Sequence, residues 1–200
     1  MRYPLWKRIF DIFGSLLGLL IFLPLTPFIA IAIKLDSKGP VIERLDRISE
    51  GRIIKVYKFR SMIENAGALK PQLAHLNERK DGPLFKIKKD PRVTRVGKLI
   101  RRIRVDEAPQ LINVLKGELA LIGPRPREPE EARQYPQEYK RIIEFRNGVT
   151  GFSQVNGASS LPFLKELELD KYYVENFSFW LDFKIFFKTI VILFFDPTAV

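Results

Sequence analysis

The longest apolar stretch of the chain runs from Ile9 to Leu35 and contains Pro24 and Pro27 near its middle. At about 1.5 Å per residue, a helix of this length reaches about 40 Å, which exceeds the roughly 30 Å hydrocarbon core of a bilayer. The stretch is too long for a cleaved signal peptide, and no small-residue cleavage site follows it. The pattern therefore predicts a helix within the membrane.

Basic residues flank this stretch and bear on its topology. They are Arg2, Lys7 and Arg8 before it and Lys34 and Lys38 at its far end. Because basic residues favour the cytoplasmic side, both ends are expected there. A re-entrant helix hairpin bent at Pro24 and Pro27 meets this condition, since a proline removes a hydrogen bond and kinks the helix. A proline-kinked helix that crosses the bilayer once is the alternative, and the residues alone leave both open.

A second apolar segment, from Phe177 to Phe195, lies near the C-terminus. It is rich in aromatic side chains and also carries Asp182, Lys184 and Lys188. Aromatic and lysine side chains at this density are typical of an amphipathic helix that lies in the headgroup region. A helix buried in the protein core is the alternative. The two apolar segments together favour a protein embedded in one leaflet of a membrane.

A β-hairpin is predicted between Pro40 and Phe59. The β-branched and aromatic residues of Val41-Ile42 and of Ile53 to Tyr57 favour extended structure. Between them, Ser49-Glu-Gly51-Arg has the composition of a turn. Strands are expected nowhere else, so the predicted fold is α+β and mostly helical, with this small hairpin.

The remaining middle of the chain is predicted to be largely helical. Val96, Leu99, Ile100 and Ile103 recur at helical spacing with cations on the opposite face. The next helix is expected to end at Gly117, a common helix-stop residue. The predicted helices cover residues 62–80, broken by Pro71, then 96–104, 106–116 and the charged segment 128–146. A turn at 81–83 and an irregular loop at 123–126, each containing proline, separate them.

Composition narrows the chemistry that the chain can perform. It has no cysteine, which excludes disulfides, thiolate metal sites and cysteine nucleophiles. Its one histidine, His75, lies in a polar stretch with no flanking catalytic motif, so a Ser-His-Asp triad is not expected. The formal net charge of +11 favours a polyanionic partner: nucleic acid, anionic lipid or a phosphorylated substrate. No DNA-binding pattern is present, and the membrane segments argue against nucleic acid.

The adjacent carboxylates Asp106 and Glu107 are the most informative polar feature. They follow the basic run 98–104 and precede an apolar helical pattern. A helix cap, with Asp106 as N-cap and Glu107 in the first turn, is one interpretation. An active site that handles an anion is the other, because phosphoryl transfer needs cations held around the phosphorus. The candidate cations for that role are Lys58, Arg60, Arg101 and Arg125, the last fixed between Pro124 and Pro126.

Several strings, taken in order, resemble the bacterial sugar transferase family, the monotopic phosphoglycosyl transferases. The similarity extends from Lys7 to about Lys188, nearly the whole chain. The strings that carry it are Lys7-Arg8-Ile-Phe-Asp11, Tyr57-Lys58-Phe59-Arg60-Ser61-Met62, Asp106-Glu107-Ala-Pro-Gln110-Leu-Ile-Asn113, Gly123-Pro124-Arg125-Pro126, Gly148-Val-Thr-Gly151-Phe-Ser-Gln154 and Asp170-Lys-Tyr172-Tyr173.

The resemblance implies a specific reaction. It implies transfer of a phosphosugar from a UDP-sugar to polyprenyl phosphate, with Asp106 as nucleophile, Glu107 as ligand of Mg²⁺ and a covalent aspartyl intermediate. Asp170 falls in a matching motif and is a candidate substrate contact. The family's hairpin also favours the re-entrant form of residues 1–38. Residues 39–200 are then expected to form a catalytic domain at the cytoplasmic face of the bacterial inner membrane, with an interfacial C-terminal helix.

The chain departs from the family pattern at Arg104, Asn147, Ser153 and Ala158, and its segment Leu45-Asp-Arg47-Ile-Ser49 lacks the Gln and Gly that are customary there. These departures bear on substrate recognition rather than on reaction type, so the sugar cannot be named from the sequence. The acceptor's length and the oligomeric state, a homo-oligomer included, stay open as well. A basic membrane-bound scaffold that recruits anionic lipid or partners without catalysis is the alternative function.

Overall fold

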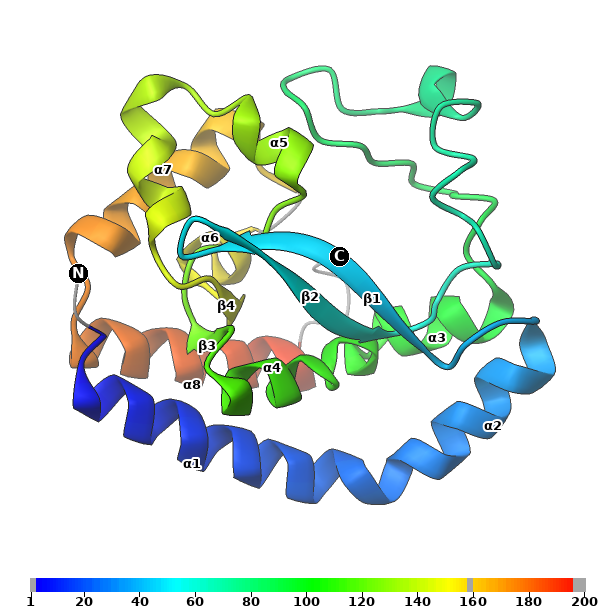
Figure 1. Ribbon diagram of the computed structural model, residues 1–200, viewed down its shortest axis with the longest axis horizontal. Coiled ribbons are helices and arrows are strands. Elements are labelled where there is room, and N and C mark those ends of the chain that lie inside the picture. Colours follow the sequence, from blue (N-terminus) through cyan, green and yellow to red (C-terminus); the bar gives the residue numbers. More distant parts are fainter. Residues whose placement is uncertain (1–2, 158–159, 196–200) are drawn as a thin grey trace.

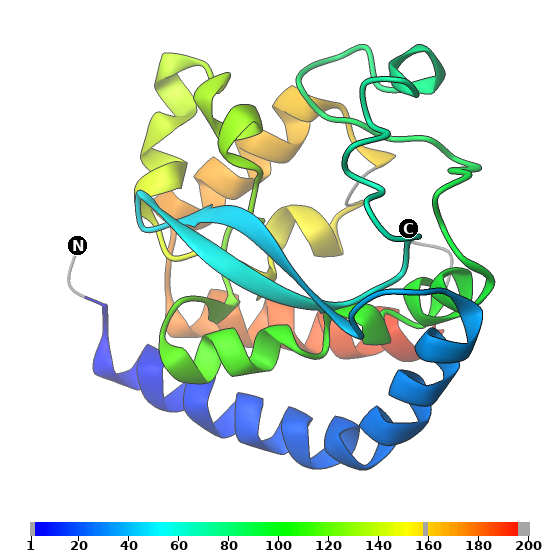
Figure 2. The same ribbon diagram turned by 45° about the vertical axis from the view of Figure 1, so that its right-hand side comes forward.

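The computed structural model describes residues 3–157 and 160–195. The chain begins with a long apolar arm made of two helices, α1 (Leu5–Phe22) and α2 (Thr26–Asp36). A 3-10 turn, Leu23–Leu25, contains Pro24 and separates them. The arm changes direction near this turn in both views (Figures 1 and 2). By length and composition alone, Leu5–Asp36 suffices to cross a membrane, and its most apolar part is almost entirely exposed.

The predicted β-hairpin is confirmed. Strands β1 (Ile42–Ser49) and β2 (Arg52–Phe59) pair antiparallel, with Ile42 opposite Phe59 and Ser49 opposite Arg52. Glu50 and Gly51 connect them with φ angles of 51° and 73°. Two successive positive φ angles match the right-handed twist of the strands, which explains the glycine. Figure 1 shows the hairpin crossing the middle of the molecule above the apolar arm.

A second, parallel pair of short strands lies in the core and was not predicted. Strand β3 (Ala120–Ile122) pairs with β4 (Gly148–Thr150). The main core cluster surrounds this pair and includes fully buried Val114 and Leu119. Short, three-residue strands lack the alternating pattern that would reveal them in a sequence. Their pairing depends on contacts between distant segments of the chain.

Three helices follow in the second half of the chain: α6 (Phe152–Val155), α7 (Phe163–Glu175) and α8 (Phe179–Phe195). Helix α8 lies beside α1 in Figures 1 and 2. The rings of Phe10 in α1 and Phe186 in α8 pack edge to face, with centroids 5.6 Å apart. One side of α8 is buried, as at Asp182 and Ile185, while Trp180 on another side is 68% exposed. Core packing and an exposed aromatic stripe therefore occur on the same helix.

A buried charge network joins the apolar arm to the core. Lys7 of α1 donates to Asp182 of α8 at 2.6 Å and to the carbonyl of Ile122 in β3 at 2.8 Å. One turn along α1, Asp11 accepts a hydrogen bond from the backbone N–H of Leu121 at 2.9 Å. The three charged side chains are almost completely buried. Each of the three side chains has hydrogen-bond or ion-pair partners, so the network joins α1, α8 and β3.

Helix α3 (Arg95–Arg102), the 3-10 turn Val105–Glu107 and α4 (Gln110–Lys116) agree with the predicted helices 96–104 and 106–116. Helix α4 ends at Gly117, whose φ of 79° explains the predicted stop. Two predicted helices are wrong. Residues 62–80 form turns with one 3-10 turn, Ala74–Leu76, and residues 128–146 divide into α5 (Pro129–Arg133) and a 3-10 helix, Gln137–Glu144.

Local chemistry explains both errors. Asn65 adopts a φ of 58°, which ends any helix there, and Gly67 and Pro71 follow within six residues. In the second segment Pro136 precedes the 3-10 helix, and a residue before proline is disfavoured in the helical conformation. Both segments contribute side chains to the cavity described next.

Candidate active site

The two adjacent carboxylates lie in the short turn between α3 and α4. Asp106 is almost completely buried, while the side chain of Glu107 is 32% exposed. Lys58 of β2 contacts both, with its Nζ 2.8 Å from an oxygen of Asp106 and 3.3 Å from an oxygen of Glu107. Arg104, just before the turn, adopts a left-handed conformation with φ of 55°. The ammonium group of Lys58 thus bridges the two carboxylates of the Asp106–Glu107 dyad.

The two carboxyl groups respond to this environment in opposite directions. Burial raises the pKa of Asp106 above its ordinary value, and the nearby Lys58 offsets only part of that effect. Burial also acts on Glu107, but the charges of Lys58 and Arg125 outweigh it and lower the pKa of that group. Pairs of acids whose pKa values are driven apart are typical of sites where the two groups have different roles.

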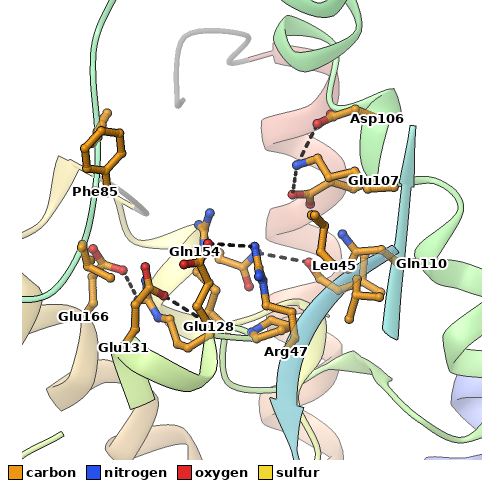
Figure 3. Close-up of a pocket in the computed structure, with 18 of the residues that line it drawn as sticks. Leu45, Arg47, Phe85, Asp106, Glu107, Gln110, Glu128, Glu131, Gln154 and Glu166 are labelled. Carbon is orange, nitrogen blue, oxygen red and sulfur yellow. Dashed lines mark hydrogen bonds and ion pairs between the residues drawn. The ribbon is translucent and has the colours of Figure 1, made fainter. Parts of the chain in front are cut away.

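The dyad opens onto a cavity of about 420 Å³, a size typical of small-molecule sites. Figure 3 shows Asp106, Glu107 and Gln110 on one side of it and Phe85, Glu131 and Glu166 on the other. Eight cationic side chains line the cavity: Arg47, Lys58, Arg79, Lys86, Arg101, Arg104, Arg125 and Arg127. Five acidic ones do so as well: Asp106, Glu107, Glu128, Glu131 and Glu166. The surplus of cations favours an anionic ligand.

Two of the predicted cations, Arg101 and Arg125, line this cavity with Lys58 and the dyad. The Nε of Arg101 donates to the hydroxyl of Ser61 at 2.8 Å, which orients the guanidinium. Asn147 donates to the carbonyls of Pro124 and Arg125 at 3.1 and 3.0 Å and so holds the proline loop in place. Asn147 is one of the departures from the family pattern, and its structural role was not predicted.

Arg60 lies elsewhere. Its guanidinium donates to the backbone carbonyls of Ile33, Ser37 and Lys38 at the C-terminal end of α2. The side chain is almost fully buried there and does not line the cavity. The structure therefore does not bring Arg60 together with the other candidate cations, but uses it to satisfy the free carbonyls of a helix end.

Asp170 lies behind the cavity wall rather than in it. It is completely buried on α7, and one of its oxygens accepts a hydrogen bond from the backbone N–H of Arg125 at 3.3 Å. Burial raises its pKa to about 6. Ser153, another departure, is also buried, and Ala158 lies outside the described residues. Asp170 thus contacts the loop that carries a candidate cation, not the cavity itself.

The acidic side chains on the far side of the cavity were not predicted from the sequence. Glu128 and Glu131 of this side come from α5 and its cap, and Glu166 comes from α7. Glu128 and Glu131 form a capping box, in which the side chain of each accepts from the backbone of the other. The spacing of these two acids around Pro129 is a helix-start signal that could have been recognised. Nothing local to the sequence places Glu166 beside them.

A magnesium ion would find suitable but incomplete ligands here. Among the described residues, no group of three or more His, Cys, Asp or Glu side chains could hold a metal. The dyad nevertheless presents two adjacent carboxylates at a cavity rich in phosphate-binding cations. Mg²⁺ characteristically takes one or two carboxylates and completes its shell with substrate phosphates and water. The residues present fit such a substrate-assisted site, with exposed Glu107 as the accessible ligand.

Several known proteins are similar to this chain in sequence. CpsE, a galactosyl transferase of Streptococcus agalactiae, is 39% identical over 189 residues, which cover 94% of this chain and 42% of the relative. The UDP-N-acetylgalactosamine-undecaprenyl-phosphate N-acetylgalactosaminephosphotransferase of Aeromonas hydrophila is 41% identical over 197 residues, covering 94% and 43%. PSS, an exopolysaccharide production protein of Rhizobium leguminosarum, is 39% identical over 197 residues, covering 92% and 93%.

The chain spans less than half the length of the first two relatives, so it corresponds to one part of each. The family model described as bacterial sugar transferase matches residues 2–196. This match covers nearly the whole chain and confirms the resemblance found in its motifs. The chain belongs to the bacterial sugar transferase family.

Proposed function

We propose that this protein is a phosphoglycosyl transferase that moves a phosphosugar from a UDP-sugar to polyprenyl phosphate, with undecaprenyl phosphate as the acceptor. The products are polyprenyl-diphosphate-sugar and UMP, and the reaction initiates assembly of a glycan or exopolysaccharide. The observation that carries the proposal is the buried Asp106 bridged to Glu107 by Lys58 at a cation-lined cavity. Relatives named as undecaprenyl-phosphate glucose and galactose phosphotransferases support it.

The proposed chemistry has two displacements at one phosphorus atom. A carboxylate oxygen of Asp106 attacks the phosphorus bonded to the sugar, the bond to the bridging oxygen breaks, and UMP leaves with the bonding electrons. A phosphate oxygen of the polyprenyl acceptor then attacks the same phosphorus, and the carboxylate of Asp106 leaves. Splitting one transfer into two steps through a covalent intermediate is nucleophilic catalysis and gives ping-pong kinetics.

The chain's other residues have electrostatic roles in this scheme. Lys58 favours the ionised form of Asp106, as a nucleophile requires. Arg101 and Arg125 are the candidates to bind phosphate oxygens, since guanidinium groups can grip them bidentately. Mg²⁺, held by Glu107 with phosphate oxygens and water, would supply further neutralisation of the diphosphate charge. Asp170 would act through the Arg125 loop rather than by touching substrate.

The apolar arm supplies the access to a lipid acceptor that this reaction needs. The proposed arrangement is a re-entrant hairpin bent near Pro24, with both ends on the cytoplasmic face of the bacterial inner membrane. The interruption of helical geometry at Leu23–Leu25 supports it. The exposed aromatic stripe of α8 would then lie in the headgroup region, where anionic lipid would complement the chain's positive charge.

The test uses the purified chain in lipid with polyprenyl phosphate, Mg²⁺ and a panel of UDP-sugars, and measures UMP release. Intact mass after incubation with the donor alone should reveal a phosphosugar adduct, which Asp106→Asn should abolish. Asp46→Asn is the matched control, because Asp46 is half-exposed and pairs only with Lys55 on the hairpin surface. If no donor yields UMP with the protein folded, the proposal fails and the non-catalytic scaffold remains.

A further inference from the structure

The two sides of the cavity differ in their chemistry. The dyad side combines the nucleophile with Lys58 and Arg101, which suit a phosphate group. The opposite side carries the three glutamates Glu128, Glu131 and Glu166 (Figure 3). A carboxylate repels phosphate oxygens, so these glutamates need another explanation if the cavity binds a sugar nucleotide.

Two of the three glutamates are already neutralised by protein cations. Glu166 is buried in ion pairs with Arg127 and, at 3.2 Å, with Arg79. Glu128 forms an ion pair with Lys70 at 2.7 Å and a longer one with Arg47 at 3.6 Å. Their charges hold the wall of the cavity together and are not available to a ligand.

Glu131 is the exception. It forms no ion pair with any of the described residues, although it lines the same cavity. One of its carboxylate oxygens accepts a hydrogen bond from the backbone N–H of Glu128 at 3.1 Å, as part of the capping box of α5. This bond fixes the position of the side chain, and the second oxygen, Oε1, accepts no hydrogen bond from the described residues. The carboxylate is therefore oriented and forms no close ion pair, although the charge of nearby Arg47 acts on it.

In a site for an anionic ligand, an oriented carboxylate that forms no ion pair can act as a hydrogen-bond acceptor. It can accept hydrogen bonds from the neutral part of that ligand, and such charge-assisted bonds are short and strong. A UDP-sugar has two neutral parts with hydroxyl groups, the nucleoside and the sugar, on either side of its diphosphate. With the diphosphate at the dyad, one of these rings must extend across the cavity.

We propose that Glu131 is a specificity-determining residue that accepts hydrogen bonds from the hydroxyl-bearing ring of the donor on the side of the cavity opposite the dyad. The inference rests on the proposed function, since it assumes that the cavity binds a sugar nucleotide. A site that hydrogen-bonds a substrate hydroxyl discriminates strongly against analogues that lack it, because the polar group is then left unpaired. Glu131 thereby contributes to the choice of donor.

The variant Glu131→Gln tests this role without removing the helix cap, since glutamine serves in a capping box as glutamate does. Glu130→Gln is the matched control, because Glu130 is the adjacent residue, is exposed and does not line the cavity. Binding of four probes to the full chain in lipid is measured: the UDP-sugar that the wild type turns over, UMP, the corresponding sugar 1-phosphate and inorganic pyrophosphate. Thermal unfolding of both variants verifies that they are folded.

The expected result is that Glu131→Gln weakens UDP-sugar binding by about tenfold, the loss expected for one hydrogen bond to a charged group. Pyrophosphate binding should stay unchanged or tighten, since the variant removes a negative charge. Weaker binding of UMP alone would assign the contact to the nucleoside, and weaker binding of sugar 1-phosphate alone would assign it to the sugar. Glu130→Gln should bind all four probes as the wild type does.

Other outcomes overturn the inference. Tighter binding of every probe would mean that Glu131 only repels the anionic ligand, and equal weakening of all four would indicate a general distortion of the cavity. No change would mean that the donor does not reach Glu131. Failure of the proposed function looks different, because then the wild type itself releases no UMP from any donor.

Discussion

The ammonium group of Lys58 lies between two carboxylates that differ in burial. It is 2.8 Å from Asp106, which is buried, and 3.3 Å from Glu107, which faces the cavity. Two anions side by side disfavour each other's ionised form, and a shared cation relieves this. In the proposed reaction the same cation would stay beside the phosphorus when Asp106 attacks. Lys58 thus links the ionisation of the nucleophile to the binding of the phosphate group.

Replacement of Lys58 should therefore change the pH profile as well as the rate. Burial already raises the pKa of Asp106, and Lys58 opposes this effect. In Lys58→Met the pKa of Asp106 should rise further, so the acidic limb of the kcat profile should move to higher pH. The rate at the optimum should fall by about 10² to 10³, the usual loss for one electrostatic contact to the reacting group.

The control for this prediction is Lys55→Met on the same strand. Lys55 is 59% exposed and pairs only with Asp46, so its replacement should leave both the limb and the rate unchanged. UMP release measured between about pH 5 and 9 provides the profile. If Lys58→Met is slower but its acidic limb is unshifted, Lys58 does not control the ionisation of Asp106.

Some candidate residues could be predicted from the sequence because the evidence for them is local. Asp106 and Glu107 are adjacent, and Arg125 is fixed between two prolines, so their proximity within each motif needs no tertiary information. Arg60 could not be placed in this way. It follows Lys58 by two residues, which suggests a shared face, yet its guanidinium contacts carbonyls 22 to 27 residues away, in the last turn of α2 and just after it.

At the scale of single elements, the end of α2 depends on that guanidinium. The last carbonyls of a helix have no intrahelical partner, and a cation near them also interacts favourably with the helix dipole. Arg60 is almost fully buried and donates to the carbonyl of Ile33 in the last turn of α2 and to those of Ser37, at 2.6 Å, and Lys38 just after the helix. It therefore fastens the end of the apolar arm to the end of strand β2.

Arg60→Ala should destabilise the protein by about 2–5 kcal/mol, because it leaves buried carbonyls without partners. The measurement is thermal or chemical unfolding of the chain in lipid or detergent. Arg52→Ala is the matched control on the same strand, since Arg52 is 62% exposed and its single partner is Glu50. Binding of the donor to folded Arg60→Ala should be unchanged. A stable variant with weakened donor binding would instead assign Arg60 to the substrate site.

In the middle of the chain, sequence patterns predicted some helices correctly and failed to predict where others are interrupted. The helix 96–104 was predicted correctly in essence because its apolar positions repeat and Thr94 caps its start. The segment 128–146 has a comparable charge pattern, but Pro136 interrupts it. A pattern of charge and hydrophobicity identifies a helix only where the backbone permits one throughout.

At the scale of the whole molecule, the apolar arm and the candidate site meet through shared elements. Helix α1 is joined to β3 and α8 by the buried network around Lys7, and α2 is joined to β2 by Arg60. Strand β2 also carries Lys58. In the proposed membrane arrangement, the position of the arm would therefore fix the position of the dyad relative to the bilayer. The sequence could predict an apolar arm, but these connections join residues more than twenty positions apart.

The proposed hairpin topology makes a prediction about which side of the membrane each part of the arm faces. The native chain has no cysteine, so single cysteines provide clean labels. Leu5 and Lys38, both exposed at the two ends of the arm, should react as cysteine variants with a membrane-impermeant maleimide only from the cytoplasmic side. Leu23, 65% exposed at the turn, should be shielded from the reagent on both sides as Leu23→Cys, because lipid surrounds it.

The two topologies differ because a re-entrant arm returns to the leaflet it entered, whereas a spanning arm of 32 residues places its ends in opposite compartments. Inverted and right-side-out vesicles containing the same variant provide the comparison, with detergent-solubilised protein as the control for full reactivity. Reaction of Leu5→Cys from one side and Lys38→Cys from the other would establish a spanning helix.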